Sequence, residues 1–150
     1  MGYIMDLRKK IGTKPLIIAG ASVLIINENN ELLLQLRKDN KCWGLIGGSM
    51  ELGETLEEVA IREMYEESGL IPTKLELLKV FSGQEFYYQY PHGDEVFNVI
   101  AAYECRSFSG VLKHDEEEAT DLKFFPLHQL PKSMSLPDQQ VIDDYLHSRE

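Results

Sequence analysis

Residues 48–70 place a short loop directly before a helix that is rich in glutamate, and this segment constrains the fold more than any other part of the chain. Thr55 with Glu58 three residues later predicts a capping box at the helix start, and Gly69 predicts a left-handed cap at its end. The apolar stripe that we expect to face the core consists of Leu56, Ala60, Ile61 and Met64. The glycines that bracket the loop, and let its backbone approach a ligand or turn sharply, are Gly47, Gly48 and Gly53.

Three carboxylates share one face of this helix, because Glu63, Glu66 and Glu67 lie at i, i+3 and i+4. Like charges at this spacing repel each other, and the neighbouring cation, Arg62, is turned by about 100° from Glu63 around the helix axis. Hard divalent cations prefer oxygen ligands, so the pattern predicts a site for Mg²⁺ or Mn²⁺. The competing interpretation is a solvated acidic face, and the glycine loop and helix cap beside the carboxylates argue against it.

The segment resembles the Nudix box, in which a glycine is followed after five residues by glutamate, and after seven more by Arg-Glu-apolar-x-Glu-Glu-x-Gly-apolar. The matching residues are Gly48, Glu54, Arg62, Glu63, Met64, Glu66, Glu67, Gly69 and Leu70. The chain departs from the family in one neighbouring position, where Ile46 stands in place of the proline that often precedes Gly-Gly.

The resemblance implies an α+β fold, namely an α/β/α sandwich with a mixed, partly antiparallel sheet between helices. We expect one Nudix hydrolase domain over residues 1–150, with residues 1–12 as a leading helix or arm. The implied activity is metal-dependent hydrolysis of a diphosphate linkage in a nucleoside diphosphate derivative, which yields a nucleoside monophosphate and the phosphorylated remainder. Which derivative is cleaved cannot be read from any spacing in the chain.

Roles within the site follow from the resemblance, position by position. The implied metal ligands are Glu63, Glu66, Glu67 and the backbone carbonyl of Gly48. The candidate catalytic groups are Glu63, Glu66 and Glu118, the last from an acidic run before the final strand in which Glu117 is the second choice. Arg62 is expected to orient Glu54 or Glu66, so Arg62 and Glu54 support the site.

Three residues outside the box are candidates for substrate binding: Arg37, Phe86 and Tyr88. Arg37 precedes the glycine loop and could offset the negative field around a polyphosphate. Phe86, Tyr88 and Tyr90 alternate, so they would line one face of a strand and could stack on a nucleobase. Core packing or dimer packing is the competing interpretation of these aromatic residues.

The formal net charge of −10 disfavours nucleic acid as a partner, since phosphate contacts along a nucleic acid require a basic surface. No apolar run approaches the roughly 18 residues that a membrane span needs. The N-terminal residues lack the apolar stretch of a secretory signal, so we expect a cytoplasmic protein. Cys42 and Cys105 are expected to be reduced thiols.

Three alternatives stay open. A catalytically silent sensor could use the same box to bind a nucleotide. A diphosphate-dependent isomerase of this fold would need an active-site cysteine, and neither Cys42 nor Cys105 has a convincing setting. The tyrosine-rich segment could instead serve self-association as a homodimer, which is compatible with catalysis.

Periodicity predicts the remaining elements. Residues 3–11 have helical spacing and stop at Gly12, and residues 16–26 and 31–37 read as a hairpin. Further strands are expected at residues 75–81, 96–105 and 122–125, and Pro137 opens a closing helix.

Overall fold

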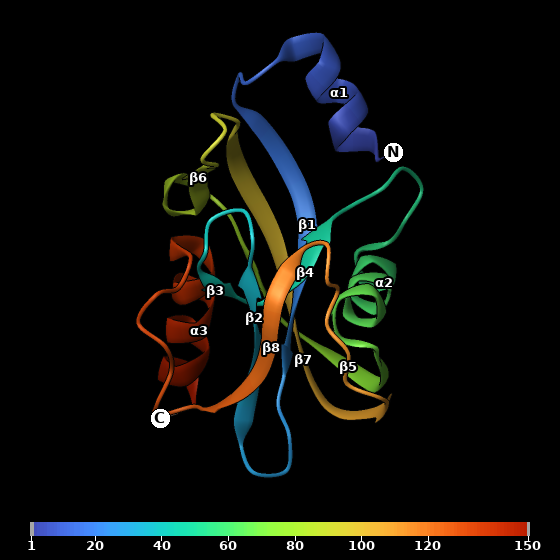
Figure 1. Ribbon diagram of the computed structural model, residues 1–150, viewed down its shortest axis with the longest axis vertical. Helices are drawn as coiled ribbons and strands as arrows, with labels where there is room; N and C mark the ends of the chain where they lie inside the picture. The colour runs from blue at the N-terminus through green and yellow to red at the C-terminus, as the bar shows by residue number, and fades with distance from the viewer. Residues whose placement is uncertain (1, 150) are drawn as a thin grey trace.

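The strands and helices of this chain form around two kinds of apolar pattern, continuous in the strands and periodic in the helices. The computed structural model, shown in Figure 1, describes residues 2–149. Its elements are α1 (Tyr3–Ile11), β1 (Leu16–Ile25), β2 (Glu31–Arg37), β3 (Trp43–Gly44), β4 (Ile46–Ser49), α2 (Leu56–Ser68), β5 (Leu70–Phe81), the short 3₁₀ helix η1 (Gln84–Phe86), β6 (Tyr87–Gln89), β7 (Glu95–Gly110), β8 (Ala119–Pro126) and α3 (Leu136–Ser148).

The strands form two sheets. The larger sheet has the order β4-β1-β7-β5, with β6 also pairing to β7. It is mixed, because β1 runs parallel to β7 while the other pairs are antiparallel. The smaller sheet has the order β3-β2-β8 and is antiparallel.

The predicted hairpin of residues 16–26 and 31–37 is wrong in its pairing. The turn itself forms, because the Asn27 side-chain oxygen accepts hydrogen bonds from the backbone N–H groups of Asn29 and Glu31. A single bridge between Ile26 and Leu32 joins the two segments, after which β1 and β2 diverge into different sheets. Each strand finds its long partner elsewhere, β1 in β7 and β2 in β8, so the hydrogen-bonding edges of a hairpin are already taken.

Successive residues of β1 point to opposite faces and fill two cores. Val23 and Ile25 pack in the cluster that includes α2, whereas Leu24 and Ile26 pack in the cluster that includes α3. Figure 1 shows the consequence, with α2 on one side of the strands and α3 on the other. The α/β/α sandwich is therefore confirmed, with two sheets in its central layer where one was expected.

The strands extend further than their apolar runs indicate. β5 begins at Leu70, directly after the cap of α2, and β7 continues to Gly110, so these two strands pair along most of their length. β8 begins at Ala119, before the predicted start. Among the helices of residues 2–149, none combines the length and the apolar composition that a membrane crossing requires.

The leading helix forms as predicted, and α1 ends where the Gly12 N–H bonds the Arg8 carbonyl. α1 is tied to two distant parts of the chain. The Arg8 guanidinium donates to the Glu95 carbonyl at 2.6 Å, and the Tyr3 N–H donates to the Glu51 carboxylate at 2.8 Å. α1 thus bridges the start of β7 and the loop that leads to α2.

Candidate active site

The start and end of α2 are fixed by local contacts that the sequence predicts. The Glu58 N–H donates to Thr55 Oγ1 at 3.1 Å, and the Thr55 N–H donates to Glu58 Oε1 at 2.8 Å, so the capping box is confirmed. Gly69 ends the helix in the left-handed conformation, with φ of 76°. The core-facing stripe differs in one position, since Val59 is buried and Ile61 is 40% exposed.

The glycines before α2 belong to a strand more than to a loop. Gly47 and Gly48 lie in β4, which pairs with β1, and the turn follows at Leu52 and Gly53. Gly48 lies directly against the helix, because a Cβ atom there would be 2.5 Å from the Glu63 carboxyl carbon. A larger residue would push the carboxylate away from the β4 backbone.

Arg62 contacts more carboxylates than its position on the helix predicts. Its guanidinium donates to both Glu54 oxygens at 2.7 and 2.9 Å, and to Glu63 Oε1 at 2.6 Å. It also reaches the Ser49 carbonyl at 3.0 Å and Glu66 at 3.5 Å. The expectation that Arg62 points away from Glu63 is wrong, because the long side chain reaches back around the axis. Arg62 therefore joins the β4 end, the loop and the acidic face.

Glu67 is the most buried of the acidic residues on α2, with 8% of its surface exposed. Its Oε1 accepts a hydrogen bond from the Gly47 N–H at 2.8 Å. Burial, together with the nearby charge of Glu63, raises the pKa of Glu67 well above its ordinary value. Burial likewise raises the pKa of Glu63, against the opposing effect of Arg62. Both carboxylates are thus costly to ionise without a further cation.

A divalent metal fits this donor set in its chemistry. All the candidate donors are oxygens, and the Gly48 cradle lets the Glu63 carboxylate lie beside the backbone that would share the ion. Glu66 is turned toward Arg62, and within residues 2–149 no group of three or more His, Cys, Asp or Glu side chains converges as a metal site. Glu63 and Glu67, whose charges act on each other, remain as the candidate ligand pair.

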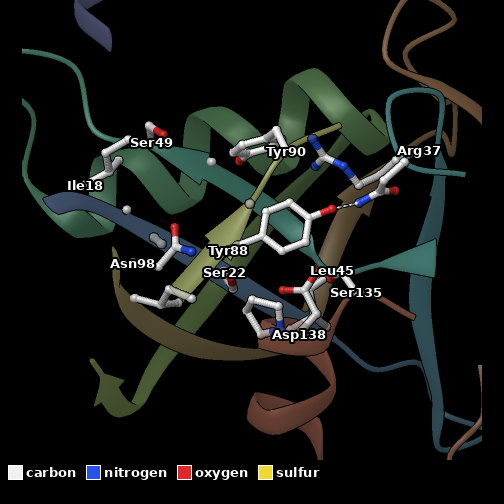
Figure 2. A pocket seen from close by; sticks show the side chains of 17 residues that line it. Ile18, Ser22, Arg37, Leu45, Ser49, Tyr88, Tyr90, Asn98, Ser135 and Asp138 are labelled. Carbon is white, nitrogen blue, oxygen red and sulfur yellow. Dashed lines mark hydrogen bonds between the residues drawn. The ribbon is translucent and has the colours of Figure 1, made fainter. Parts of the chain in front are cut away.

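A cavity of about 120 Å³ opens beside β4, on the side toward α3 (Figure 2). Its floor comes from β1 and β4, including Gly47, Gly48 and Ser49. The other walls are contributed by the end of β2 and the segment after it, by β6 and the residue that follows it, by β7 and by the start of α3. The polar side chains among them are Arg37, Asn40, Tyr88, Tyr90, Asn98, Ser135 and Asp138. The cavity and the acidic face of α2 thus share the short strand β4.

Arg37 lines this cavity, as its assignment to substrate binding requires. Two hydrogen bonds hold its guanidinium to the Asp39 carboxylate, at 3.0 and 2.7 Å. Burial acts to lower the pKa of Arg37, but the hydrogen bonds and charge of Asp39 outweigh it and the pKa is raised. The guanidinium is therefore a permanent, oriented cation at the cavity wall.

The aromatic residues divide between the cavity and the core. Tyr88 and Tyr90 line the cavity with their rings edge to face at 4.9 Å, and Asn40 donates to the Tyr88 hydroxyl at 2.8 Å. Phe86 lies elsewhere, because it is 5% exposed and packs at 5.3 Å from Phe81 in the core under α3. The assignment of Phe86 to substrate binding is therefore corrected, since a 3₁₀ turn breaks the alternation before Tyr87.

Glu118 is exposed and precedes β8 directly. Its carbonyl accepts a hydrogen bond from the Lys38 N–H at 3.0 Å, and the Lys38 ammonium bonds the Glu116 carbonyl. The acidic loop is thereby held next to the segment that carries Arg37. These contacts involve the backbone carbonyls of Glu116 and Glu118 and not the Glu118 carboxylate, whose role stays a prediction.

Sequence reasoning missed Asp138, which lies at the cavity wall in the first turn of α3. Its Oδ2 accepts hydrogen bonds from the Ser135 hydroxyl at 2.8 Å and from the Leu45 N–H at 3.1 Å, and burial raises its pKa. The available signal was Ser135 followed three residues later by an acid at a helix start. Asn40 and Asn98 carried no such signal, since they come from separate segments.

The two cysteines take no part in the cavity. Cys105 is buried in the core with α2, where burial raises its pKa, and Cys42 is half-buried before β3. Neither lines the cavity beside β4, which removes the support for an isomerase with an active-site thiol.

Comparison with known proteins places these features in context. A family model described as the NUDIX domain matches residues 17–145. An ADP-ribose pyrophosphatase from Methanocaldococcus jannaschii is 37% identical over 125 residues, which cover 81% of this chain and 69% of the relative. The NAD-capped RNA hydrolase NudC from Pectobacterium carotovorum is 30% identical over 117 residues, which cover 77% of this chain and 41% of that protein. The chain thus spans less than half of this second relative.

Two solved structures show the same fold. A MutT NUDIX hydrolase from Burkholderia pseudomallei superposes with a TM-score of 0.71 at 24% identity, covering 85% of this chain and 97% of that one. The NUDIX domain of Shewanella oneidensis NrtR, complexed with ADP ribose, gives a TM-score of 0.71 at 19% identity over 100% of both chains. At these identities the likeness concerns the fold alone.

Proposed function

The chain belongs to the Nudix hydrolase family, and from this premise we propose that it hydrolyses the diphosphate linkage of a nucleoside diphosphate derivative with Mg²⁺ or Mn²⁺. Water adds to one phosphorus, the bridging P–O bond breaks, and the products are a nucleoside monophosphate and the phosphorylated remainder. The observation that carries the proposal is the pair of carboxylates, half-buried Glu63 and buried Glu67, beside a β4 backbone that only glycine allows so close. We also propose that residues 1–150 form a single Nudix hydrolase domain.

The cofactor would be held by Glu63, Glu66, Glu67 and the Gly48 carbonyl. When bound, a divalent ion lowers the pKa of a coordinated water and offsets charge on the phosphate oxygens. Arg62 holds Glu54 and Glu63 in place through its fork of N–H donors. Glu66 would turn from Arg62 to the ligand set, a rotation that its exposed side chain permits.

The proton of the attacking water needs an acceptor. Glu63, Glu66 and Glu118 are the candidates, and their settings differ. Glu63 is held by Arg62 against β4, whereas Glu118 lies on an exposed loop beside the segment that carries Arg37. A carboxylate on a loop can approach a bound substrate without leaving its backbone contacts, so we favour Glu118 for proton transfer and Glu63 for metal binding.

The cavity beside β4 would receive the non-phosphate part of the substrate. Arg37 can bind a phosphate oxygen at its wall, and Tyr88 offers a ring for contact with a base or sugar. Asp138 faces the same space and can accept a hydrogen bond from an N–H or hydroxyl group. The names of the relatives support ADP-ribose as the first compound to test.

The test is a screen of purified protein against ADP-ribose, nucleotide sugars, dinucleotides and nucleoside triphosphates with Mg²⁺ or Mn²⁺. A coupled phosphatase would follow the released phosphomonoester. Glu67→Gln is expected to lower kcat by about 100-fold or more, because it removes a charged ligand without changing shape. Glu57→Gln, on the exposed first turn of the same helix, should leave kcat unchanged. Full turnover by Glu67→Gln would remove the acidic face from the chemistry.

A second candidate is a sensor that binds the nucleotide without cleaving it. The observation in its favour is the contact of Glu66 with Arg62, which draws one carboxylate away from the other two. Tight ADP-ribose binding by calorimetry, with no product after hours in Mg²⁺ or Mn²⁺, would establish this function in place of hydrolysis. Self-association through the tyrosine-rich segment is a separate prediction, which sedimentation at several concentrations would test.

A further inference from the structure

Gln35 is a polar residue that interrupts the run of leucines in β2, and it is 1% exposed. Its Nε2 reaches the Leu45 carbonyl only at a long 3.4 Å. Its Oε1 is buried without a hydrogen-bond partner among the described residues. A buried amide with an unpaired oxygen destabilises a fold, so packing alone gives no reason for glutamine here.

The side chain of Gln35 lies on the Glu67 side of β2. Leu33, two residues earlier on the same face, packs in the core with α2, whereas Leu32 and Leu34 pack with α3. The Gln35 amide lies at the Leu45 carbonyl and the Glu67 carboxylate at the Gly47 N–H, so both side chains meet the same short stretch of chain before and within β4. The pKa of Glu67 is accordingly affected by Gln35, which acts to lower it against the larger effect of burial. The Gly47 N–H holds Glu67 Oε1 at 2.8 Å. Glu67 is therefore hydrogen-bonded to an amide of β4 and lies beside the amide of Gln35 on β2.

We propose that Gln35 is a positioning residue, which fixes the carboxylate of Glu67 in the orientation that binds the metal ion. The inference rests on the proposed function, in which Glu67 is a metal ligand. Groups that surround a metal-binding side chain restrict its rotation, so less conformational entropy is lost when the ion binds. Gln35 is suited to this because it reaches Glu67 from a strand in the centre of the smaller sheet.

The test measures metal binding without substrate or turnover. Free Mn²⁺ would be followed by electron paramagnetic resonance in titrations of wild type and Gln35→Leu. We expect the variant to bind Mn²⁺ about 10-fold to 100-fold more weakly, the range found for groups that support metal ligands. In steady-state assays at fixed Mn²⁺, kcat should fall while KM for substrate changes by less than about 2-fold. The melting temperature should be unchanged or higher, because an unpaired buried amide is lost.

Matched variants separate positioning from packing. Leu34→Val perturbs the neighbouring residue on the opposite face of β2, and it should lower the melting temperature without changing Mn²⁺ affinity. Gln35→Met keeps the length of the side chain, and it should weaken Mn²⁺ binding as Gln35→Leu does, even where leucine impairs folding.

A double-mutant cycle with Glu67→Gln decides whether Gln35 acts through Glu67. In the Glu67→Gln background, Gln35→Leu should cause no further loss of Mn²⁺ affinity. Wild-type Mn²⁺ binding by Gln35→Leu and Gln35→Met, or the same loss in both backgrounds, would overturn the inference. If Glu67→Gln itself binds Mn²⁺ as wild type does, the proposed function fails first, so the two failures are distinguishable.

Discussion

At the scale of single residues, Arg62 holds the carboxylates of the acidic face in position. It binds Glu54 with two N–H groups, Glu63 with a third, and the Ser49 carbonyl at the end of β4. A single planar guanidinium can satisfy these acceptors at once because its donors have a fixed fork geometry. An ammonium group of the same charge cannot.

Arg62→Lys therefore tests geometry with charge held constant. We expect kcat to fall by about 10-fold to 100-fold, because Glu54 and Glu63 lose their common support. The melting temperature should fall by only a few degrees, since the group is partly exposed. Lys74→Gln, at an exposed ion pair with Glu76, is the control and should change neither quantity. Unchanged kcat in Arg62→Lys would show that the fork geometry has no bearing on the reaction.

Glu67 should give the metal-free protein a distinctive dependence on pH. Burial and the charge of Glu63 raise the folded pKa of Glu67 well above 4.5, the value expected for the unfolded chain. Between these two pKa values the folded state binds more protons, so the free energy of unfolding falls as pH rises through this window. Glu67→Gln removes the titration while keeping the shape.

In EDTA, the melting temperature of Glu67→Gln relative to wild type is expected to increase from about pH 4.5 toward pH 8. Each kcal/mol corresponds to about 2–4 °C for a chain of this size. Scanning calorimetry at several pH values would measure the difference in melting temperature. If the difference in melting temperature between Glu67→Gln and wild type stays constant with pH, Glu67 ionises at the same pH in the folded and unfolded states.

At the scale of elements, the position of α2 depends on its two caps. Thr55→Ala removes the side-chain acceptor for the Glu58 N–H and is expected to cost about 1 kcal/mol, or about 2–4 °C in melting temperature. Thr55→Ser keeps the hydroxyl and should lose less than half as much. Thermal unfolding followed by circular dichroism would measure both, and equal losses would show that the methyl group and not the cap matters.

The elements that the sequence predicts well are those with local signals. Thr55, Glu58 and Gly69 fix α2, and Gly12 ends α1, through contacts within a few residues. The β1 and β2 pairing was wrong because strand pairing is decided by distant segments. Leu16 begins a ladder with Val96, and Leu32 pairs with Phe125, at separations that no local pattern reports.

The same division holds for the site at the scale of the whole molecule. Glu63, Glu66 and Glu67 lie within one helix, so their spacing alone puts them on one face of it. The polar groups of the cavity come from segments far apart in the chain. Asn98 lies on β7, Asp138 on α3 and Arg37 at the end of β2, and only the pairing of strands and the packing of α3 place them near β4. Long-range packing therefore decides the cavity in which we propose that the substrate is bound.

The formal net charge of −10 affects the rate at which a negatively charged substrate reaches the protein. At about 10 mM salt the Debye length is about 30 Å, so the charge of the whole protein repels a nucleoside diphosphate derivative. At about 150 mM salt the Debye length is about 8 Å, and the substrate near the cavity then responds mainly to Arg37 and the bound cation.

We expect kcat/KM to rise by about 2-fold to 10-fold from low to physiological salt at saturating Mg²⁺, with kcat unchanged. A combined Glu28→Gln, Glu57→Gln and Glu116→Gln variant, altered only at exposed positions, should show a flatter dependence. A kcat/KM that falls steadily with added salt would show that local attraction by basic residues already dominates at long range.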